Sequence, residues 1–175
     1  MDVVGAPEDL KRELLPRVHQ VLSRTILERP PEFAPGLEET LRQLKDRGYL
    51  LGFVSNTSVT PGATFRELFA RRGLLDLFDS LTFSDEVLLL KPNPRVFELA
   101  AERLGVATGQ LLHVGDGPLT DVEGAQAAGA LGAAYTGLYH AYHDERERQR
   151  NLRLLRERVR PDFLVREHPE LLSFL

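Results

Sequence analysis

The sequence contains no cysteine, which excludes disulfide bonds, thiolate chemistry and zinc sites built from cysteine ligands. No apolar run approaches the roughly 20 residues that a membrane-spanning helix needs, so no membrane partner is expected. The first residues, Met1 to Gly5, lack the basic and apolar regions of a secretory signal. The formal net charge is -4, and no basic stripe with interleaved aromatic residues occurs, which argues against nucleic acid as a partner. These absences predict a soluble, cytoplasmic protein.

The chain has 175 residues, a length that suits one domain with at most a small appendage. Hydrophobic residues make up 42% and charged residues 27%, values typical of a globular protein that buries a sizeable core. Short apolar runs alternate with segments of helical periodicity. The expected helices cover about 7–28, 35–48, 63–72, 92–104, 121–128 and 143–158, and the expected strands cover 49–54, 80–83, 111–114, 132–135 and 163–165, before a short closing helix. This alternation predicts an α/β fold with a parallel sheet covered on both faces.

Polar clusters follow two of these strands, at the edge of a parallel sheet where ligands usually bind. The loop from Gly115 to Asp121 carries two carboxylates, Asp116 and Asp121, on either side of a turn. Oxygen ligands of this kind suit magnesium, although a plain turn in which Asp121 caps the next helix also fits the pattern. Ser55 and Asn56 could donate hydrogen bonds to a phosphate oxygen, or could form an ordinary turn.

A lysine stands before one of the expected helices, in the segment Lys91-Pro92-Asn93-Pro94. An ammonium at such a position could lie over a bound anion. The alternative is an exposed loop lysine, which is the commonest environment for this residue. None of the three features decides the function alone, but their order along the chain is specific.

At these residues the chain resembles the haloacid dehalogenase (HAD) superfamily. Residues 51–57 (LGFVSNT) are similar to its second motif, 91–94 (KPNP) to its third, and 113–125 (HVGDGPLTDVEGA) to its fourth. The resemblance extends over roughly residues 30–175. It implies a Rossmann-like core and a phosphatase-like hydrolase that acts on a small phosphorylated metabolite with Mg²⁺. By the same resemblance, Ser55 would hold the phosphoryl group with Asn56 beside it, Lys91 would stabilise its charge, and Asp116 and Asp121 would bind or support the metal.

The family's first motif, a strand followed by Asp-x-Asp-x-Thr, does not occur in this sequence. Its first aspartate is the nucleophile and its second is the general acid and base. Asp2 is no substitute, because it lacks the apolar strand, the second aspartate and the threonine. In the family this strand lies between those that carry Ser55 and Asp116, so without it the two strands would either pair directly or leave two edges open. Residues 1–34 are expected to form a truncated helical cap remnant, and 35–175 the HAD-like core.

Three explanations of the missing motif stay open. The chain could be an incomplete form of an enzyme, a short form that repacks its sheet or exchanges a strand in a homodimer, or a non-catalytic descendant. Two hypotheses follow. The first is a magnesium-dependent phosphatase-like hydrolase that is inactive or incomplete as it stands. The second is a non-catalytic module of the same fold that binds phosphate, metal or a partner.

Other functions fit the sequence less well. A receiver domain has its acidic pair early and its lysine late, the reverse of the order found here. Neither a dinucleotide fingerprint nor a Gly-x-x-x-x-Gly-Lys phosphate loop is present. His140 and His143 could share a helix face and bind zinc, but the start of a solvated charged helix is the plainer interpretation. Residues 146–160 alternate in charge, which predicts a solvated helix face with local ion pairs.

Overall fold

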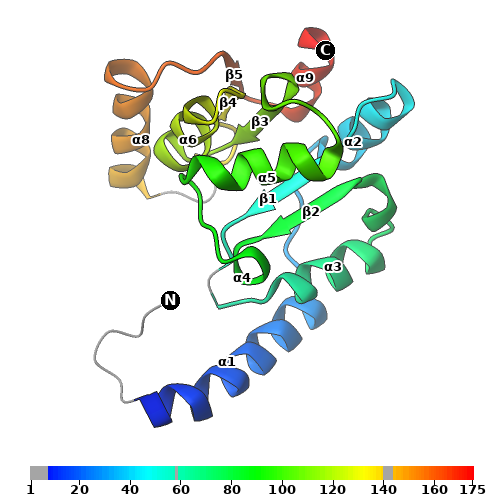
Figure 1. Ribbon diagram of the computed structural model, residues 1–175, viewed down its shortest axis with the longest axis vertical. Helices are drawn as coiled ribbons and strands as arrows, with labels where there is room; N and C mark the ends of the chain where they lie inside the picture. Colours follow the sequence, from blue (N-terminus) through cyan, green and yellow to red (C-terminus); the bar gives the residue numbers. More distant parts are fainter. Residues whose placement is uncertain (1–7, 58, 140–143) are drawn as a thin grey trace.

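A computed structural model describes residues 8–57, 59–139 and 144–175 (Figure 1). The chain alternates helices and strands, as the apolar pattern predicts. The strands are β1 (Gly52–Ser55), β2 (Ser80–Phe83), β3 (Leu112–Gly115), β4 (Leu131–Tyr135) and β5 (Phe163–Val165). The α-helices are α1 (Glu8–Glu28), α2 (Leu37–Asp46), α3 (Gly62–Arg71), α4 (Ser84–Val87), α5 (Pro94–Leu104), α6 (Gly124–Ala127), α8 (Glu145–Glu157) and α9 (Leu171–Phe174). Three 3₁₀ helices, η1 (Leu75–Leu77), η2 (Thr108–Gln110) and η4 (His168–Glu170), and one π-helical segment, η3 (Pro118–Glu123), complete the described elements.

All strand pairs are parallel, and helices cover the sheets on both sides, which confirms the α/β fold class. The strands nevertheless form two sheets: β1 pairs with β2, and β3, β4 and β5 pair in that order. Within the described residues β1 and β3 are not paired with each other. Of the two arrangements expected without a central strand, the structure therefore has the one with open edges.

The register of each sheet shows which backbone groups lie at these open edges. In a parallel ladder, the N–H and C=O of one residue point to the same side of the strand, and those of the next residue point to the other side. Leu51 O accepts from Ser80 N, and Leu111 O accepts from Leu131 N, so odd-numbered residues of β1 and β3 serve the existing ladders. The even-numbered residues, Gly52 and Val54 in β1 and Leu112 and Val114 in β3, direct their backbone groups away from β2 and β4.

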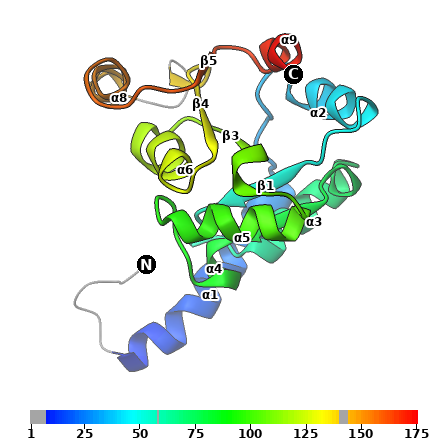
Figure 2. The ribbon, with the colours of Figure 1, turned by 45° about the horizontal axis from the view of Figure 1, so that its top comes forward.

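Helix α5 holds the two sheets together. It packs against β1 and β2 of the first sheet and against α6, which in turn contacts β4 of the second sheet (Figure 2). The two sheets with the helices that pack on them are called the two halves below. Its buried residues Val96 and Phe97 share a core cluster with Val54 of β1 and with Leu111, which immediately precedes β3. The Phe97 ring also meets the ring of His113 in β3 edge-on, with centroids 4.9 Å apart. Burial of this helix face, rather than a strand-to-strand ladder, connects the halves.

A separate aromatic core supports β1 and β2 on the side of α3. The Phe53 ring lies 5.2 Å from Phe69, 5.9 Å from Phe78 and 5.8 Å from Phe83 between centroids. Edge-to-face and tilted contacts of this kind add to the hydrophobic gain of burial. Helix α2 reaches both sheets: it packs against η1 beside β2 and also against η4 and α9, where Arg47 donates to the Leu172 carbonyl at 2.8 Å. The carboxyl ends of β1 and β3 are thus carried by two sheets with separate cores, which α5 and α2 join.

Helix α1 projects from the body of the protein (Figure 1). It contacts α3, where the hydroxyls of Ser23 and Thr64 lie 2.7 Å apart. Leu14, Val18 and Val21, which the sequence places on its apolar stripe, are 42%, 39% and 52% exposed. This apolar face of α1 is therefore only partly covered by other described residues. The division into residues 1–34 and 35–175 stays a prediction.

Most element boundaries lie within two residues of the expectations, and two differ by three residues. The strand expected from Tyr49 begins at Gly52, and Tyr49 and Leu50 are exposed before it. The Tyr49 hydroxyl donates to the Leu175 carbonyl at 2.7 Å, which directs this residue away from the sheet. The helix expected over 121–128 begins earlier, as the π-helical turn η3, in which Gly117 O accepts from Asp121 N and Val122 N. A π turn gives no hydrophobic period that a sequence could reveal, and such turns are frequent at functional sites.

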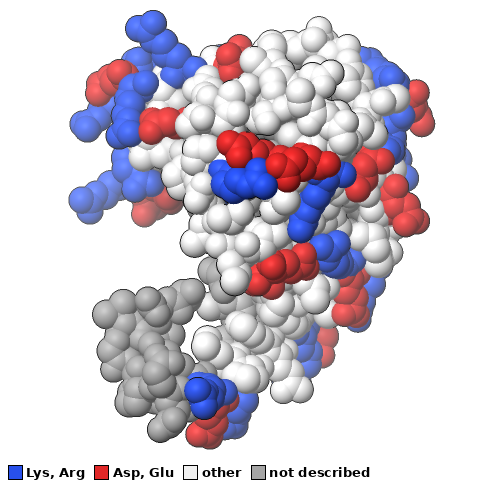
Figure 3. Space-filling view, in the orientation of Figure 1, with Lys and Arg blue, Asp and Glu red and all other residues white. Residues whose placement is uncertain are grey.

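The surface carries charges of both signs in close alternation. Figure 3 shows Lys and Arg side chains interspersed with Asp and Glu on the face it presents. Along α8, Arg150 pairs with Glu147 and Arg153 with Glu157, each at 3.5 Å. The charged segment therefore has the exposed helical ion pairs that its sequence predicts. His140 and His143 lie outside the described residues.

Candidate functional site

The candidate residues gather where β1 and β3 end. Ser55 is the last residue of β1 and Gly115 the last of β3, and the loop and η3 that follow carry Asp116 and Asp121. Lys91 comes from the segment before α5. Three stretches far apart in the sequence are thus brought to one edge of the fold, as expected for the carboxyl ends of parallel strands.

Lys91 lies between the two sheets and is largely buried. Its ammonium donates to Asp121 Oδ1 at 2.6 Å and to the Val54 carbonyl at 3.0 Å, and the two paired side chains are only 13% and 7% exposed. Val54 O is one of the backbone groups at the open edge of β1. Lys91 therefore connects that edge to the loop after β3 and is not the exposed loop lysine of the alternative interpretation.

Asp121 is held as an ionised carboxylate. Burial alone would raise the pKa of Asp121, but the hydrogen bond from His113 and the charge of Lys91 outweigh burial and hold the pKa well below its usual value. His113 Nε2 lies 2.9 Å from Asp121 Oδ1, and burial lowers the pKa of His113. A carboxylate can only accept, so the neutral imidazole carries its proton on Nε2.

Asn56 clamps the main chain of Lys91. Its side-chain amide donates to Lys91 O at 2.9 Å, and its Oδ1 accepts from Lys91 N at 2.8 Å. This paired contact fixes where the lysine stem leaves the backbone. The structure therefore gives Asn56 a positioning contact that the sequence did not predict. Ser55, the residue before it, is partly buried at the end of β1.

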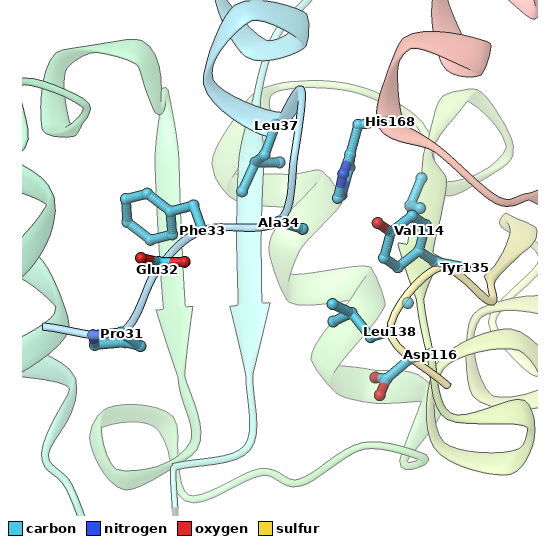
Figure 4. A pocket seen from close by; sticks show the side chains of 11 residues that line it. Pro31, Glu32, Phe33, Ala34, Leu37, Val114, Asp116, Tyr135, Leu138 and His168 are labelled. Carbon is cyan, nitrogen blue, oxygen red and sulfur yellow. The ribbon is translucent and has the colours of Figure 1, made fainter. Parts of the chain in front are cut away.

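Asp116 faces a pocket of about 370 Å³ (Figure 4). Val114 and Gly115 of β3 form one wall, while Phe33 and Ala34 form part of the other. The remaining lining residues are Pro31, Glu32, Leu37, Tyr135, Leu138 and His168. The Tyr139 hydroxyl donates to the Asp116 carbonyl at 2.8 Å, and burial, together with the charges of Asp116 and Asp121, raises the pKa of Tyr139 to about 12. A neutral phenol thus anchors the loop while the Asp116 carboxylate reaches the pocket.

Two glycines in this loop are required by the position of Asp121. A Cβ on Gly115 would lie 2.4 Å from Asp121 Cγ, and a Cβ on Gly117 would lie 2.1 Å from Thr120 Oγ1. The close approach lets Gly117 N donate to Asp121 Oδ2 at 2.8 Å. The Gly-Asp-Gly sequence is therefore more than a turn signal, because it makes room for a buried carboxylate.

The donor set fits magnesium in one restricted way. Both Asp121 oxygens accept hydrogen bonds from protein groups, which makes this residue a support rather than an open ligand. Over residues 8–57, 59–139 and 144–175, no cluster of three or more His, Cys, Asp or Glu side chains could hold a metal ion. Magnesium commonly takes one or two carboxylates and completes its shell with water and phosphate oxygens. Asp116 could serve as such a carboxylate.

Sequence reasoning missed His113, Tyr139 and the pocket wall from Pro31 to Leu37. A histidine two residues before Gly115 looks like part of an apolar strand. Successive side chains of a strand point to opposite faces, and only the prediction that His113 shares a face with Asp121 could have suggested a role for it. The 31–37 wall comes from a proline-rich connection whose position depends on packing between α2 and η4. In the described part of the chain, no helix is long and apolar enough to cross a bilayer.

Comparison with known proteins agrees with the resemblance. Residues 3–129 match the family model of the haloacid dehalogenase-like hydrolases. The glyceraldehyde 3-phosphate phosphatase of Methanopyrus kandleri is 37% identical over 99 residues, which cover 55% of this chain and 40% of that protein. The phosphoglycolate phosphatase of Pectobacterium atrosepticum is 34% identical over 104 residues, 59% of this chain and 43% of that protein. The matched region thus spans less than half the length of these two relatives.

A solved structure shares the fold. The HAD phosphatase from Thermococcus onnurineus superposes with a TM-score of 0.69 at 28% identity, over 87% of this chain and 63% of that one. The family model covers well over half of the sequence, including Lys91, Asp116 and Asp121. This chain belongs to the haloacid dehalogenase-like hydrolases and is phosphatase-like in sequence and fold.

Proposed function

We propose that this chain binds Mg²⁺ and the phosphate of a small phosphorylated metabolite, in the cytoplasm, and that it hydrolyses phosphomonoesters little or not at all. The observation that carries the proposal is the Lys91–Asp121 pair, 2.6 Å between Nζ and Oδ1, at the strand ends where Asp116 lines a pocket. Relatives named as phosphatases for glyceraldehyde 3-phosphate and phosphoglycolate support the ligand class.

Each residue has a role in binding. Magnesium, when bound, would neutralise phosphate charge, and Asp116 would hold it. The Ser55 hydroxyl would donate to a phosphate oxygen, and the Lys91 ammonium, whose backbone Asn56 holds, would face the negative charge of the phosphate. Asp121 keeps Lys91 in place and, through Gly117, shapes the loop that presents Asp116.

The sequence lacks the motif that carries the family's chemical step. The family's hydrolysis uses an aspartate nucleophile and a second aspartate as acid and base, in an Asp-x-Asp sequence. No Asp-x-Asp occurs anywhere in the 175 residues. Asp121, which lies nearest to Lys91, is committed to hydrogen bonds through both oxygens. Binding without turnover follows from these two facts.

Magnesium together with inorganic phosphate is expected to raise the melting temperature of the chain. A ligand that binds only the native state stabilises it by about 2.7 kcal/mol at a hundredfold excess over Kd. For a protein of this size that corresponds to roughly 5–10 °C. The shift is measured by thermal unfolding with and without both ligands, in wild type and in Asp116→Asn, and we expect the variant to lose it.

Asp46→Asn is the matched control, because Asp46 is an exposed carboxylate at the end of α2. This control should melt with the wild-type ligand shift. An Asp116→Asn protein that kept the full shift would remove Asp116 from the proposal, and a wild type without any shift would contradict phosphate and magnesium binding altogether.

Turnover of a generic phosphomonoester such as p-nitrophenyl phosphate is expected to be at or near the uncatalysed background with magnesium present. The assay uses pure chain, with Lys91→Met prepared in parallel as a blank for any contaminating phosphatase. Magnesium-dependent turnover that disappears in Lys91→Met would contradict the proposal, because it would mean that another residue of this chain supplies the nucleophile.

A further inference from the structure

The turn that follows β1 is held at two points by the segment from Ser84 to Lys91. This segment comprises α4 and the chain that leads to α5, and Figure 1 shows α4 beside the carboxyl ends of β1 and β2. At one end of the segment, the Lys91 backbone exchanges two hydrogen bonds with the Asn56 side chain. At the other end, the first two residues of α4 bind Thr57. The turn that carries the Ser55 hydroxyl is therefore fixed on both sides.

Thr57 is bound through its main chain and its side chain. Its amide donates to Ser84 Oγ at 2.9 Å, and the Ser84 hydroxyl donates to the Thr57 carbonyl at 3.2 Å. The Thr57 hydroxyl donates to Asp85 Oδ1 at 2.6 Å and accepts from the Asp85 amide at 3.1 Å. Each of the two α4 residues thus exchanges a pair of hydrogen bonds with the same threonine, which restricts rotation of the turn.

The second carboxylate oxygen of Asp85 is also in use. Asp85 Oδ2 accepts from the amide of Gly62, the first residue of α3, at 3.0 Å. Burial raises the pKa of Asp85, but the hydrogen bonds from the Thr57 hydroxyl and the Gly62 amide outweigh burial and hold the pKa below its usual value. Asp85 is therefore an ionised acceptor at neutral pH, and it connects the turn after β1 to the start of α3.

Helix α4 can hold this turn because it is itself anchored in the core. It is a single helical turn, closed by a hydrogen bond from Leu88 N to Ser84 O at 2.9 Å. Val87 and Leu89 pack against the core cluster to which Val54 of β1 also belongs. The anchor of α4 thus lies against the same strand whose carboxyl end α4 holds.

We propose that Asp85 is a positioning residue of the phosphate site: it holds Thr57, and through this turn it fixes the Ser55 hydroxyl relative to Lys91. The inference rests on the proposed function for the phosphate, whereas the hold on the turn is a property of the free chain. Charge alone does not account for Asp85, because a carboxylate repels a phosphate. Its contacts with Thr57 and Gly62 supply the geometric reason.

Matched substitutions separate positioning from charge. Thr57→Val keeps the shape of the side chain and removes the hydroxyl, whereas Thr57→Ser keeps the hydroxyl. Asp85→Asn removes a charge at nearly constant size, and Asp76→Asn, at an exposed carboxylate in η1, is the control for the loss of one negative charge. Because Thr57→Val breaks the same contact from the other side, the test does not depend on one variant folding. All variants are full-length chains.

The first measurement is amide hydrogen exchange of the free chain by NMR. Lys91 N is the reporter, because its acceptor is Asn56 Oδ1 and not a group of Thr57 or Asp85. Exchange at this amide is expected to become about fivefold faster or more in Asp85→Asn and Thr57→Val, the effect of losing one typical hydrogen bond. Thr57→Ser and Asp76→Asn should leave it within about twofold of wild type. Unchanged exchange in both Asp85→Asn and Thr57→Val would overturn the proposal, whether or not the chain binds phosphate.

The second measurement is calorimetric titration with inorganic phosphate at saturating magnesium. Asp85→Asn and Thr57→Val are expected to raise the Kd for phosphate by about tenfold, as for a lost hydrogen bond that involves a charged group. The direction is informative, because removing a negative charge by itself lowers this Kd or leaves it unchanged, as expected for Asp76→Asn. An equal or lower Kd in Asp85→Asn would contradict the proposal, as would Thr57→Ser binding as weakly as Thr57→Val.

The two proposals fail separately. A wild-type chain that binds no phosphate loses the proposed function, and exchange at Lys91 then still decides whether Asp85 holds the turn. A wild-type chain that binds phosphate, with no response of Lys91 exchange to the substitutions, keeps the proposed function and loses the positioning role of Asp85.

Discussion

Asp121→Asn is expected to lower the free energy of unfolding by about 3–5 kcal/mol, the usual cost of removing one partner from a buried ion pair. The substitution leaves the Lys91 ammonium in a site where it is 13% exposed, beside an amide instead of a carboxylate. It also replaces one carboxylate oxygen by an NH₂ group, which is a donor. That donor would face groups that themselves donate to Asp121, either His113 and Lys91 or Gly117 N. Urea unfolding followed by circular dichroism measures the change.

The pH dependence gives an independent check on this pair. The pKa of Asp121 is lowered in the folded state, so the carboxylate's contribution to stability is complete above its unfolded pKa of 3.8. That contribution is lost as the pH falls below this value toward the folded pKa. Wild type should therefore lose stability between pH 4 and pH 2 more steeply than Asp121→Asn. Parallel curves for the two proteins would mean that Asp121 is not the ionised partner described above.

Phe97→Ala is expected to cost about 3–5 kcal/mol of unfolding free energy, the range measured for aromatic residues truncated in a core. Phe97 is 0% exposed, contacts the His113 ring and belongs to the cluster that joins β1 to the chain before β3. The cavity would therefore lie at the junction of the two sheets. Denaturant unfolding measures the loss.

Val18→Ala is the control for Phe97→Ala, because Val18 is 39% exposed on α1 and should change stability by less than about 0.5 kcal/mol. If Phe97→Ala cost no more than this control, α5 would not be what connects the sheets. A further consequence concerns ligand binding. Loosening the junction should also weaken the magnesium and phosphate shift, because Lys91 and Asp116 reach the site from different halves.

The sequence predicts the order and type of the elements well, because local patterns encode them. The run Ser80 to Phe83 became a strand with the expected bounds, and α5 ends at the expected residue, Leu104, although it begins at Pro94, two residues after the expected start. Capping residues and apolar periodicity act over a few residues, so they can be seen without the fold. The resemblance to known motifs located Lys91 and Asp121, and the structure brings their side chains into contact.

Long-range features could not be derived in the same way. That β1 and β3 stay unpaired depends on α5 filling the space beneath them, which no local signal records. The Asn56 contact with the Lys91 backbone links residues 35 positions apart, and the ion pair of Lys91 with Asp121 links residues 30 positions apart. The π turn at Pro118 to Glu123 likewise follows from fitting Asp121 against Gly115.

The central claim is that two half-sheets meet at open strand edges, and amide hydrogen exchange of the free chain tests it most directly. Along β1 and β3 the account predicts an alternation: slow exchange at Phe53, Ser55, His113 and Gly115, whose N–H groups face β2 or β4, and fast exchange at the residues between them. Uniform protection through both strands, including Gly52, Val54, Leu112 and Val114, would mean that the edges are paired, and would contradict the account.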